Sequence, residues 1–509
     1  MKGTDRVLFN TAITYAKAIV TSIVSLYATR LILNSLGAAD FGIYNVVGGM
    51  IAMLSFLNAA MTTSTQRYLS YSLGTGSFDK VKTIFGNSII IHFFLALIVV
   101  ILIEVVGVYL IKKQLVIAPE KVQTALWILH FLAISTFFTI ITVPYNAVIN
   151  AHENMTFLAV LGIVEAFLKL VVAFSLSFFV DNRLFFYGLL IMLCTIFRIT
   201  IKCIYSKKKY EECNTKVLKS YEPKEIKELT SFASWNLFGT LCALGRNQGV
   251  SVILNLFYTT IVNAAYGIAS QINSQLMFFS QTLMSALRPQ IMKSEGAKNR
   301  SRMIKLALTA NKLSFFLFTL FAIPLFFEMP LVLKFWLKDV PNYSVEFCRA
   351  IILLTMMNQI NMGLMSAVQA IGEIKVYQIV AGSVQLLTLP LGFVVLKLGY
   401  EPYSIILISF GLEVISTVFR MFYFKYLTGF SVKTYFISVI FTSFSCLFII
   451  LVVIWFFKTV LNLSGVYIIA LHGLAFILYG IIIYFVGLSK DEKQVAKGFI
   501  TKLKLKLKK

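Results

Sequence analysis

The sequence predicts an all-α polytopic membrane protein, on three observations. Hydrophobic residues make up 58% of the 509 residues and charged residues only 13%, with a mean hydropathy of +0.83. A soluble domain carries about 25% charged residues, so this composition cannot supply a water-facing surface. The apolar residues come in runs of about twenty or more, long enough to cross a hydrocarbon core of about 30 Å. No run shows the short alternating pattern of a membrane barrel, so we expect helices that satisfy their own backbone hydrogen bonds.

We place fourteen helical spans along the chain. The first six fall near residues 8–36, 41–64, 84–111, 122–149, 156–180 and 184–204. After a polar stretch, eight more fall near 229–256, 262–287, 305–328, 346–371, 376–397, 403–424, 434–457 and 465–487. The first span is too long, and too poor in small residues at a cleavage site, to be a removable signal peptide.

The basic residues lie mainly on one side of these spans. The net charge is +24, from 46 Lys and Arg against 22 Asp and Glu. With the N-terminus inside, most of the basic residues fall in cytoplasmic segments, chiefly 202–228, 288–305 and 488–509. This asymmetry follows the positive-inside rule. The charge therefore records an orientation with both termini in the cytoplasm, and it does not indicate nucleic-acid binding.

Motifs for catalysis and cofactor binding are missing from the sequence. The six cysteines form no CxxC pair and the four histidines are scattered, so we expect neither a disulfide framework nor a metal site. No Walker A motif, dinucleotide-binding loop or nucleophile elbow occurs in a suitable context. The longest external loop, near 329–345, holds no cluster of acids or histidines, which argues against a polysaccharide polymerase or ligase. We expect a transporter without a cofactor, and no enzyme.

A weak internal repeat relates two halves of six spans each. Six is an even number, so both halves enter the membrane in the same sense and form parallel six-helix bundles. Aliphatic matches mean little in so apolar a chain, so the repeat rests on charged pairs at matching helix ends. At offsets of 220 to 222 residues, Glu153 falls on Glu373, Arg67 on Arg288 and Arg198 on Arg420.

The repeat divides the chain into five predicted parts. These are an N-terminal six-helix bundle (1–204), a cytoplasmic linker (205–228), a second six-helix bundle (229–425), two additional spans (426–487) and a basic cytoplasmic tail (488–509). Parallel repeats place a substrate path between them and open it alternately to each side. The tail either lies on anionic headgroups or is a solvated segment that only fixes the topology.

Ionisable residues inside the spans are candidates for substrate contact, because each costs about 2.5–3.5 kcal/mol at a helix centre. The first span carries a polar stripe at helical spacing, from Asn10 through Lys17 to Ser25, which lipid would exclude. The small members of the stripe could instead only hold helices together. In the seventh span, Arg246 occupies the place of Ser25 through the repeat. We therefore predict that Lys17 and Arg246 form a cationic ladder in one cavity.

Other charged residues are weaker candidates. Lys169 lies four residues after Glu165, in the favourable order for an ion pair that is either structural or functional. Arg30 lies nearer the end of the first span and on another side of it. Arg67 and Arg288, at the inner ends of the second and eighth spans, either recruit an anion at the cytoplasmic mouth or anchor the helices. The candidates for ion coupling are Glu104, Glu165 and Glu413.

Four segments together resemble a known family. They are LGAADFGIYNVVGGM (36–50), TQRYLS (65–70), VPYNAVINAHENM (143–155) and AVQAIGEIK (367–375). They resemble the O-antigen and capsule repeat-unit flippases of the multidrug/oligosaccharidyl-lipid/polysaccharide (MOP) exporter superfamily. The resemblance implies a MATE-like fold around an alternating cavity, and an undecaprenyl-pyrophosphate-linked oligosaccharide as the substrate in the bacterial inner membrane. It implies contact with membrane lipids and makes a polysaccharide polymerase a candidate partner.

Two other transporters of the same fold are alternatives. A lipid II flippase would use the same chemistry, and the sequence does not separate it from an O-antigen or capsule flippase. A multidrug/cation antiporter would need carboxylates in its cavity, whereas the stripe of the first span carries Lys17 and no acid. A pyrophosphate that leaves water needs cations, which lysine and arginine provide, arginine bidentately.

Overall fold

The computed structural model describes residues 3–52, 55–115, 117–179, 181–258, 260–337, 339–460 and 466–494. Across these ranges every regular element is a helix, so the all-α prediction is confirmed. A helix satisfies its own backbone polar groups, which a chain in hydrocarbon requires.

The chain folds as two compact units. The N-terminal unit comprises Phe9–Leu237 with Gly296–Lys298, and the C-terminal unit comprises Met1–Leu8, Phe238–Glu295 and Asn299–Lys509. The division falls inside one long helix, α8 (Pro223–Phe257). The first turns of α8 thus belong to the N-terminal unit and the remainder to the C-terminal unit.

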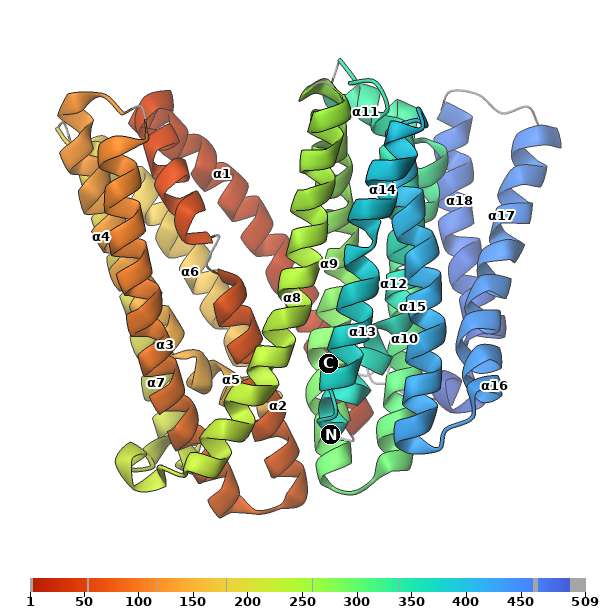
Figure 1. The fold of residues 1–509 in the computed structure, drawn as a ribbon, viewed down its shortest axis with the longest axis horizontal. Coiled ribbons are helices and arrows are strands. Elements are labelled where there is room, and N and C mark those ends of the chain that lie inside the picture. The colour runs from red at the N-terminus through yellow and green to blue at the C-terminus, as the bar shows by residue number, and fades with distance from the viewer. Residues whose placement is uncertain are drawn as a thin grey trace, which may run out of the picture. The chain divides into compact units, whose positions relative to one another are not determined.

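The N-terminal unit is built from seven helices and the start of α8 (Figure 1). They are α1 (Gly3–Ala52), α2 (Ser55–Thr75), α3 (Phe78–Lys113), α4 (Pro119–Ile141), α5 (Val143–Ala151), α6 (Met155–Ser175) and α7 (Arg183–Lys209). Short 3-10 turns follow α6 (Leu176–Phe178) and α7 (Glu211–Asn214 and Val217–Ser220).

Two predicted spans of this unit are not single straight helices. Within α1, Gly37 has a φ of 78°, a left-handed conformation that glycine adopts without steric cost, and the helix kinks there. The predicted span 41–64 is bent, because its segments Ala39–Ile51 and Phe56–Thr75 are inclined by 50°. The predicted span 122–149 breaks between α4 and α5, where Pro144 lacks a backbone N–H and suits only the first turn of a new helix.

The C-terminal unit contains the rest of α8 and the ten helices that follow. They are α9 (Thr260–Gly296), α10 (Arg300–Phe327), α11 (Met329–Leu337), α12 (Ser344–Ile371), α13 (Lys375–Leu386), α14 (Thr388–Lys397), α15 (Ser404–Thr428), α16 (Val432–Tyr435), α17 (Thr442–Val460) and α18 (Val466–Ile482). Turns of π-helix follow α16 (Phe436–Phe441) and α18 (Ile483–Gly487).

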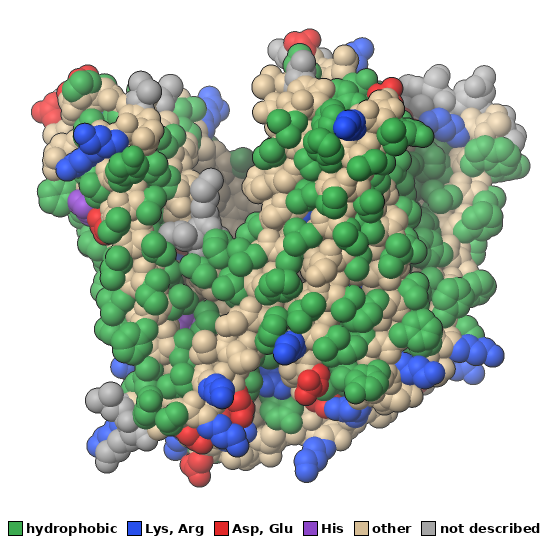
Figure 2. Space-filling view, viewed as in Figure 1, with side chains coloured by type: hydrophobic (Ala, Val, Ile, Leu, Met, Phe, Trp, Pro, Cys, Tyr) green, Lys and Arg blue, Asp and Glu red, His purple; other side chains and the backbone are tan. Residues whose placement is uncertain are grey.

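Ten helices among the described residues are long and apolar enough to cross a membrane, or eleven if the bent pair counts as one span. Helices α8 and α9, with 35 and 37 residues, are long enough but are not among them, since amide side chains such as Asn236, Asn247 and Asn263 interrupt their apolar runs. The predicted count of fourteen is therefore not established. Figure 2 shows hydrophobic side chains covering the flanks, with Lys and Arg gathered mainly along the lower edge. The chain is a multi-pass membrane protein.

The last two helices, α17 and α18, lie outside the predicted repeat but are linked to α10 at its C-terminal end and in its middle. At one end, Glu328 accepts from Lys458 of α17 at 3.1 Å and pairs with His472 of α18 at 3.2 Å. In the middle of α10, Nζ of the buried Lys312 lies 2.7 Å from the carboxylate of Glu492, which follows α18. These ion pairs make α17 and α18 an integral part of the C-terminal unit.

Candidate functional site

A cluster of charged side chains lies in the N-terminal unit, where α1, α6 and α7 meet. Glu165 of α6 pairs with Lys169 one turn along the same helix, with Oε1 3.0 Å from Nζ. The other carboxylate oxygen lies 3.6 Å from Nε of Arg198 on α7. The i, i+4 spacing puts Glu165 and Lys169 on one helix face. The ion pair expected from that spacing is present, and α7 adds a second cation to it.

Lys17 of α1 reaches the same cluster because a glycine leaves room for it. A Cβ placed on Gly162 of α6 would lie 2.3 Å from Cε and 2.9 Å from Nζ of Lys17. Any larger residue at this position would displace the lysine side chain. Glu165 lies one turn further along α6 and interacts electrostatically with Lys17. The first helix therefore contributes a third cation around this acid.

Sequence reasoning missed a fourth cation, Lys202 of α7. It is only 8% exposed, and its Nζ donates to Oδ1 of Asn146 at 3.4 Å. Its charge interacts with Arg198, Glu165 and Lys17. The signal was the i, i+4 spacing of Arg198 and Lys202, which puts two cations on one face of α7. From the sequence, Arg198 served only as a marker of the repeat, and residue 202 was placed at the start of a basic cytoplasmic segment.

We call these five residues the α1–α6–α7 cluster: Lys17, Glu165, Lys169, Arg198 and Lys202. Four cations around one carboxylate give it a formal charge of +3. The Lys169 side chain is 44% exposed, and those of Glu165 and Arg198 are each 24% exposed, so the cluster is accessible. Because each unpaired charge in a span costs about 2.5–3.5 kcal/mol, the cluster favours an anionic ligand.

The C-terminal unit holds a smaller and more deeply buried group. Arg420 and Glu413 of α15 form an ion pair whose side chains are 6% and 1% exposed. Asn361 of α12 donates to Glu413 at 3.5 Å and to the hydroxyl of Thr417 at 2.7 Å. The carboxylate of Glu413 is therefore neutralised by a neighbour on its own helix, which makes it a poor site for a coupling cation.

Arg246 of α8 lies near this buried pair. Its Nε and Nη2 donate to Oδ1 of Asn247 at 3.2 and 3.0 Å, and its charge interacts with Glu413 and with Tyr266 of α9. Arg246 thus belongs to the C-terminal unit and Lys17 to the N-terminal unit, each within reach of its own acid. The ladder of Lys17 and Arg246 across one cavity stays a prediction.

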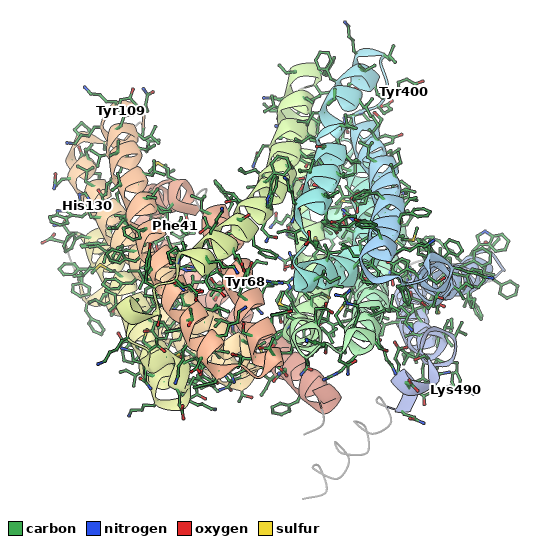
Figure 3. All side chains as sticks on the ribbon, turned by 60° about the horizontal axis from the view of Figure 1, so that its bottom comes forward. Phe41, Tyr68, Tyr109, His130, Tyr400 and Lys490 are labelled. Carbon is green, nitrogen blue, oxygen red and sulfur yellow. The ribbon has the colours of Figure 1, made fainter. Side chains whose placement is uncertain are left out.

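Arg67 of α2 lies inside an aromatic cage. It is 7% exposed, and its guanidinium carbon lies 4.4 Å from the ring centroid of Tyr68, 4.9 Å from that of Tyr71 and 5.3 Å from that of Phe232 on α8. Figure 3 shows the labelled Tyr68 where α2 meets α8. Such stacking stabilises a desolvated cation by about 2 kcal/mol. The arrangement favours the interpretation of Arg67 as an anchor between these helices.

The remaining predicted residues lie apart from both groups. Arg288 of α9 is partly buried, and its Nε has no hydrogen-bond partner among the described residues. Arg30 of α1 is exposed. Glu104 of α3 pairs with His130 of α4, with Oε2 2.8 Å from Nδ1 and the side chains 33% and 40% exposed. Figure 3 shows His130 at the outer edge of the N-terminal unit, so Glu104 serves a surface ion pair.

The glycine that receives Lys17 has a counterpart in the predicted repeat. At offsets of 220 and 221 residues, Gly162 falls on Gly382 and Lys17 falls on Phe238. A Cβ on Gly382 would lie 2.9 Å from Sγ of Cys242 and 3.3 Å from the ring of Phe238, whereas a Cβ on Gly162 would lie 2.3 Å from Cε of Lys17. The predicted repeat therefore pairs a cation of the N-terminal unit with an aromatic ring of the C-terminal unit, so these two positions differ in charge.

Among the described residues, no group of three or more His, Cys, Asp or Glu is placed to hold a metal ion. The six cysteines are all free thiols. The chemistry available at the α1–α6–α7 cluster is therefore electrostatic binding by lysine and arginine.

Comparison with known proteins identifies the fold. The MatE family model matches residues 249–394. A MATE structure in the straight conformation superposes with a TM-score of 0.71 at 12% identity, covering 84% of this chain and 98% of that one. An outward-facing multidrug resistance MATE family transporter of the MOP superfamily gives 0.69 at 11% identity, covering 84% and 97%. No curated protein matches the sequence.

A third solved structure also shares the fold. It is a MOP superfamily transporter from Pyrococcus furiosus, described as having a binding pocket of reverse polarity. It superposes with a TM-score of 0.65 at 13% identity, covering 84% of this chain and 99% of that one. The prediction of a MATE-like fold is confirmed. The chain has the fold of the MATE transporters of the MOP superfamily, and its residues 249–394 match the MatE family.

Proposed function

We propose that this protein is a flippase that moves an undecaprenyl-pyrophosphate-linked oligosaccharide, an O-antigen or capsule repeat unit, across the bacterial inner membrane. The observation that carries the proposal is the α1–α6–α7 cluster, with four cations around one acid in membrane-spanning helices. The pyrophosphate is the part of such a substrate that must leave water with its charge. A cluster with a formal charge of +3 supplies the compensation.

The four cations suit a phosphate in complementary ways. Arg198 offers a planar fork that matches phosphate oxygens, whereas the three lysines act as point charges on flexible stems. At 4 Å and an effective dielectric constant of 20, each contact with a unit charge is worth about 4 kcal/mol before the desolvation cost. Lys169, 44% exposed, is the most accessible contact, and Lys202, 8% exposed, is the most buried. The glycan would cross in the wet path while the lipid tail stays in the bilayer.

Alternating access is the mechanism that we propose for the movement. The solved structures that share the fold include a straight, a bent and an outward-facing conformation. Parallel repeats that rock against each other open a path first to one side and then to the other. The cytoplasmic location of both termini and a polysaccharide polymerase as partner belong to this proposal.

A multidrug/cation antiporter is the competing function, because the MatE match fits it equally well. Such a protein needs free carboxylates for a cationic drug. Here Glu165 is paired with Lys169 and Arg198, and Glu413 is paired with Arg420. The reverse polarity described for the Pyrococcus furiosus protein supports an altered charge within this superfamily. A lipid II flippase would handle the same pyrophosphate, so the glycan distinguishes it.

Export of surface glycan in a strain that lacks its own flippase tests the proposal. The wild-type chain should restore the glycan, and Lys17→Ala and Arg198→Ala should each reduce it at least tenfold at equal protein abundance. Lys112→Ala, which removes an exposed lysine at the end of α3, is the matched control and should export normally.

Ethidium efflux without glycan export would identify an antiporter. Rescue of a strain depleted of its lipid II flippase, without glycan export, would identify a lipid II flippase.

A further inference from the structure

Glu165 is the one acid that the described residues place among the cations of the α1–α6–α7 cluster. Its two carboxylate oxygens are divided between two partners, Oε1 with Lys169 and Oε2 with Arg198. These two cations are 44% and 24% exposed, whereas Lys202 is buried. A phosphate that enters the cluster must therefore meet the donors that the carboxylate already uses.

A carboxylate and a phosphate cannot both keep these donors without strong mutual repulsion. At 4 Å, two unit negative charges repel by about 4 kcal/mol at an effective dielectric constant of 20. The charged and titratable groups that face Glu165 come from three helices: Lys17 of α1, Lys169 of α6, and Cys194, Arg198 and Lys202 of α7. Entry of the anion therefore displaces the carboxylate from at least one partner.

We propose that Glu165 is a built-in counter-anion that competes with the substrate for Lys169 and Arg198 and so promotes its release. The inference rests on the proposed function. In the empty site the carboxylate pairs with both cations, and in the loaded site the pyrophosphate replaces it. Transport requires binding weak enough for the ligand to leave. Four uncompensated cations would hold a pyrophosphate too tightly, and the returning carboxylate lowers that affinity.

A comparison with the Glu413–Arg420 pair shows why Glu165 can exchange its partners and Glu413 cannot. The Glu413–Arg420 pair is 1% and 6% exposed and is reinforced by Asn361. Glu165 is 24% exposed, and its contact to Arg198 spans 3.6 Å, longer than a hydrogen bond. A change of side-chain rotamer is enough to release and re-form such a contact. The pair in the C-terminal unit is structural, whereas the pair in the N-terminal unit is exchangeable.

The affinity for undecaprenyl pyrophosphate tests the inference, measured on the full-length protein in lipid nanodiscs. Glu165→Gln removes the competing charge at nearly constant volume, so it should bind at least tenfold more tightly than wild type. Its turnover in proteoliposomes should fall, because release becomes slow. Glu120→Gln, which neutralises an exposed acid in the first turn of α4, is the matched control and should match wild type.

Each outcome decides a separate claim. Weaker or unchanged binding by Glu165→Gln would overturn the inference, because a structural or ligand-contacting carboxylate does not compete. If Glu165→Gln does not accumulate, Glu165→Asp takes its place. The shorter aspartate competes less well for the two cations, so this variant should bind undecaprenyl pyrophosphate more tightly than wild type, by a smaller factor than Glu165→Gln. Binding equal to or weaker than that of wild type would reject the competition. Failure of wild type to bind, or unchanged binding by Lys17→Ala, would instead reject the proposed function.

Discussion

Lys17 lies directly on Gly162, so that a Cβ at the glycine would be 2.3 Å from Cε of the lysine. The predicted repeat pairs these residues with Phe238 and Gly382, where a Cβ on the glycine would lie 3.3 Å from the ring and 2.9 Å from Sγ of Cys242. A single packing position thus serves two purposes in one chain. In the N-terminal unit it directs an ammonium group toward Glu165, and in the C-terminal unit it packs a ring.

Gly162→Ala should mimic the loss of Lys17. The added methyl group overlaps the lysine stem, so Lys17 must leave its place, although alanine favours the helix by about 1 kcal/mol over glycine. We expect normal protein abundance with export reduced at least fivefold. Gly49→Ala is the control, since nothing lies within 4 Å of its Cβ position. Normal export by Gly162→Ala would show that transport does not require Lys17 to pack against position 162.

The Glu413–Arg420 pair should show strong thermodynamic coupling. Removing one partner leaves a buried charge, at a cost of about 3–5 kcal/mol, whereas an apolar replacement of both is often neutral. Glu413→Leu and Arg420→Met should each lower the unfolding temperature in detergent, and the double variant should recover most of it. Additive losses of unfolding temperature in the double variant would contradict coupling between Glu413 and Arg420. Export by the double variant would exclude Glu413 as an ion-coupling residue.

Arg67→Lys should reduce stability rather than transport per molecule. The lysine keeps the positive charge but cannot stack its planar group on Tyr68, Tyr71 and Phe232. We expect a loss of roughly 1–2 kcal/mol in the free energy of unfolding, from the stacking of a desolvated cation. Export, divided by the amount of folded protein, should be unchanged. A specific loss of export would restore the interpretation of Arg67 as a recruiting residue.

The linker after α7 should lose stability in acid. Glu212 is 1% exposed and its Oε1 lies 2.6 Å from Nε2 of His152, whose ring stacks on Tyr210. Burial opposes the ionised form, but the hydrogen bonds from His152 and from the backbone outweigh it, so the pKa of Glu212 lies below that of a free glutamate. A lowered pKa stabilises the fold above about pH 4.3, and this contribution is lost as pH falls further.

Thermal unfolding of wild type and Glu212→Gln in detergent checks this pH dependence. At pH 7 the variant should be less stable by about 1.5–3 kcal/mol, the usual contribution of a hydrogen bond to a charged group. The difference should narrow as the pH falls below about 4.3, because the carboxyl of the unfolded chain becomes neutral there and that of the folded protein only at lower pH. A difference that stays constant down to pH 3.5 would contradict the assignment.

Sequence patterns predict the fold of this chain well because the membrane imposes long apolar helices. The breaks are less visible: the kink at Gly37 and the break at Thr142 depend on local backbone conformation. The spans 229–256 and 262–287 were predicted from their apolar runs and correspond to α8 and α9. Amide side chains lower the hydropathy of both helices, so neither is among the helices that are long and apolar enough to cross a membrane. Contacts between apolar helix faces cannot be predicted from a single sequence.

The candidate site was only partly predictable. The Glu165–Lys169 pair follows from helical spacing, but the approach of Lys17 depends on Gly162, 145 positions away in a different helix. Lys202 was counted with the cytoplasmic basic residues, because burial by a neighbouring helix cannot be predicted from its own segment. The same limit applies to Arg67, whose partner Phe232 comes from the start of α8. Charge identifies candidates, and tertiary packing decides which of them meet.

The most direct test of the central claim compares two ligands that differ only in their head. Wild-type protein in nanodiscs should bind undecaprenyl pyrophosphate at least a hundredfold more tightly than undecaprenol, because the α1–α6–α7 cluster recognises the pyrophosphate. The double variant Lys17→Ala/Arg198→Ala should lose most of this preference while keeping its affinity for undecaprenol. Equal binding of both lipids by wild type, or a preference that survives in the double variant, would contradict the account.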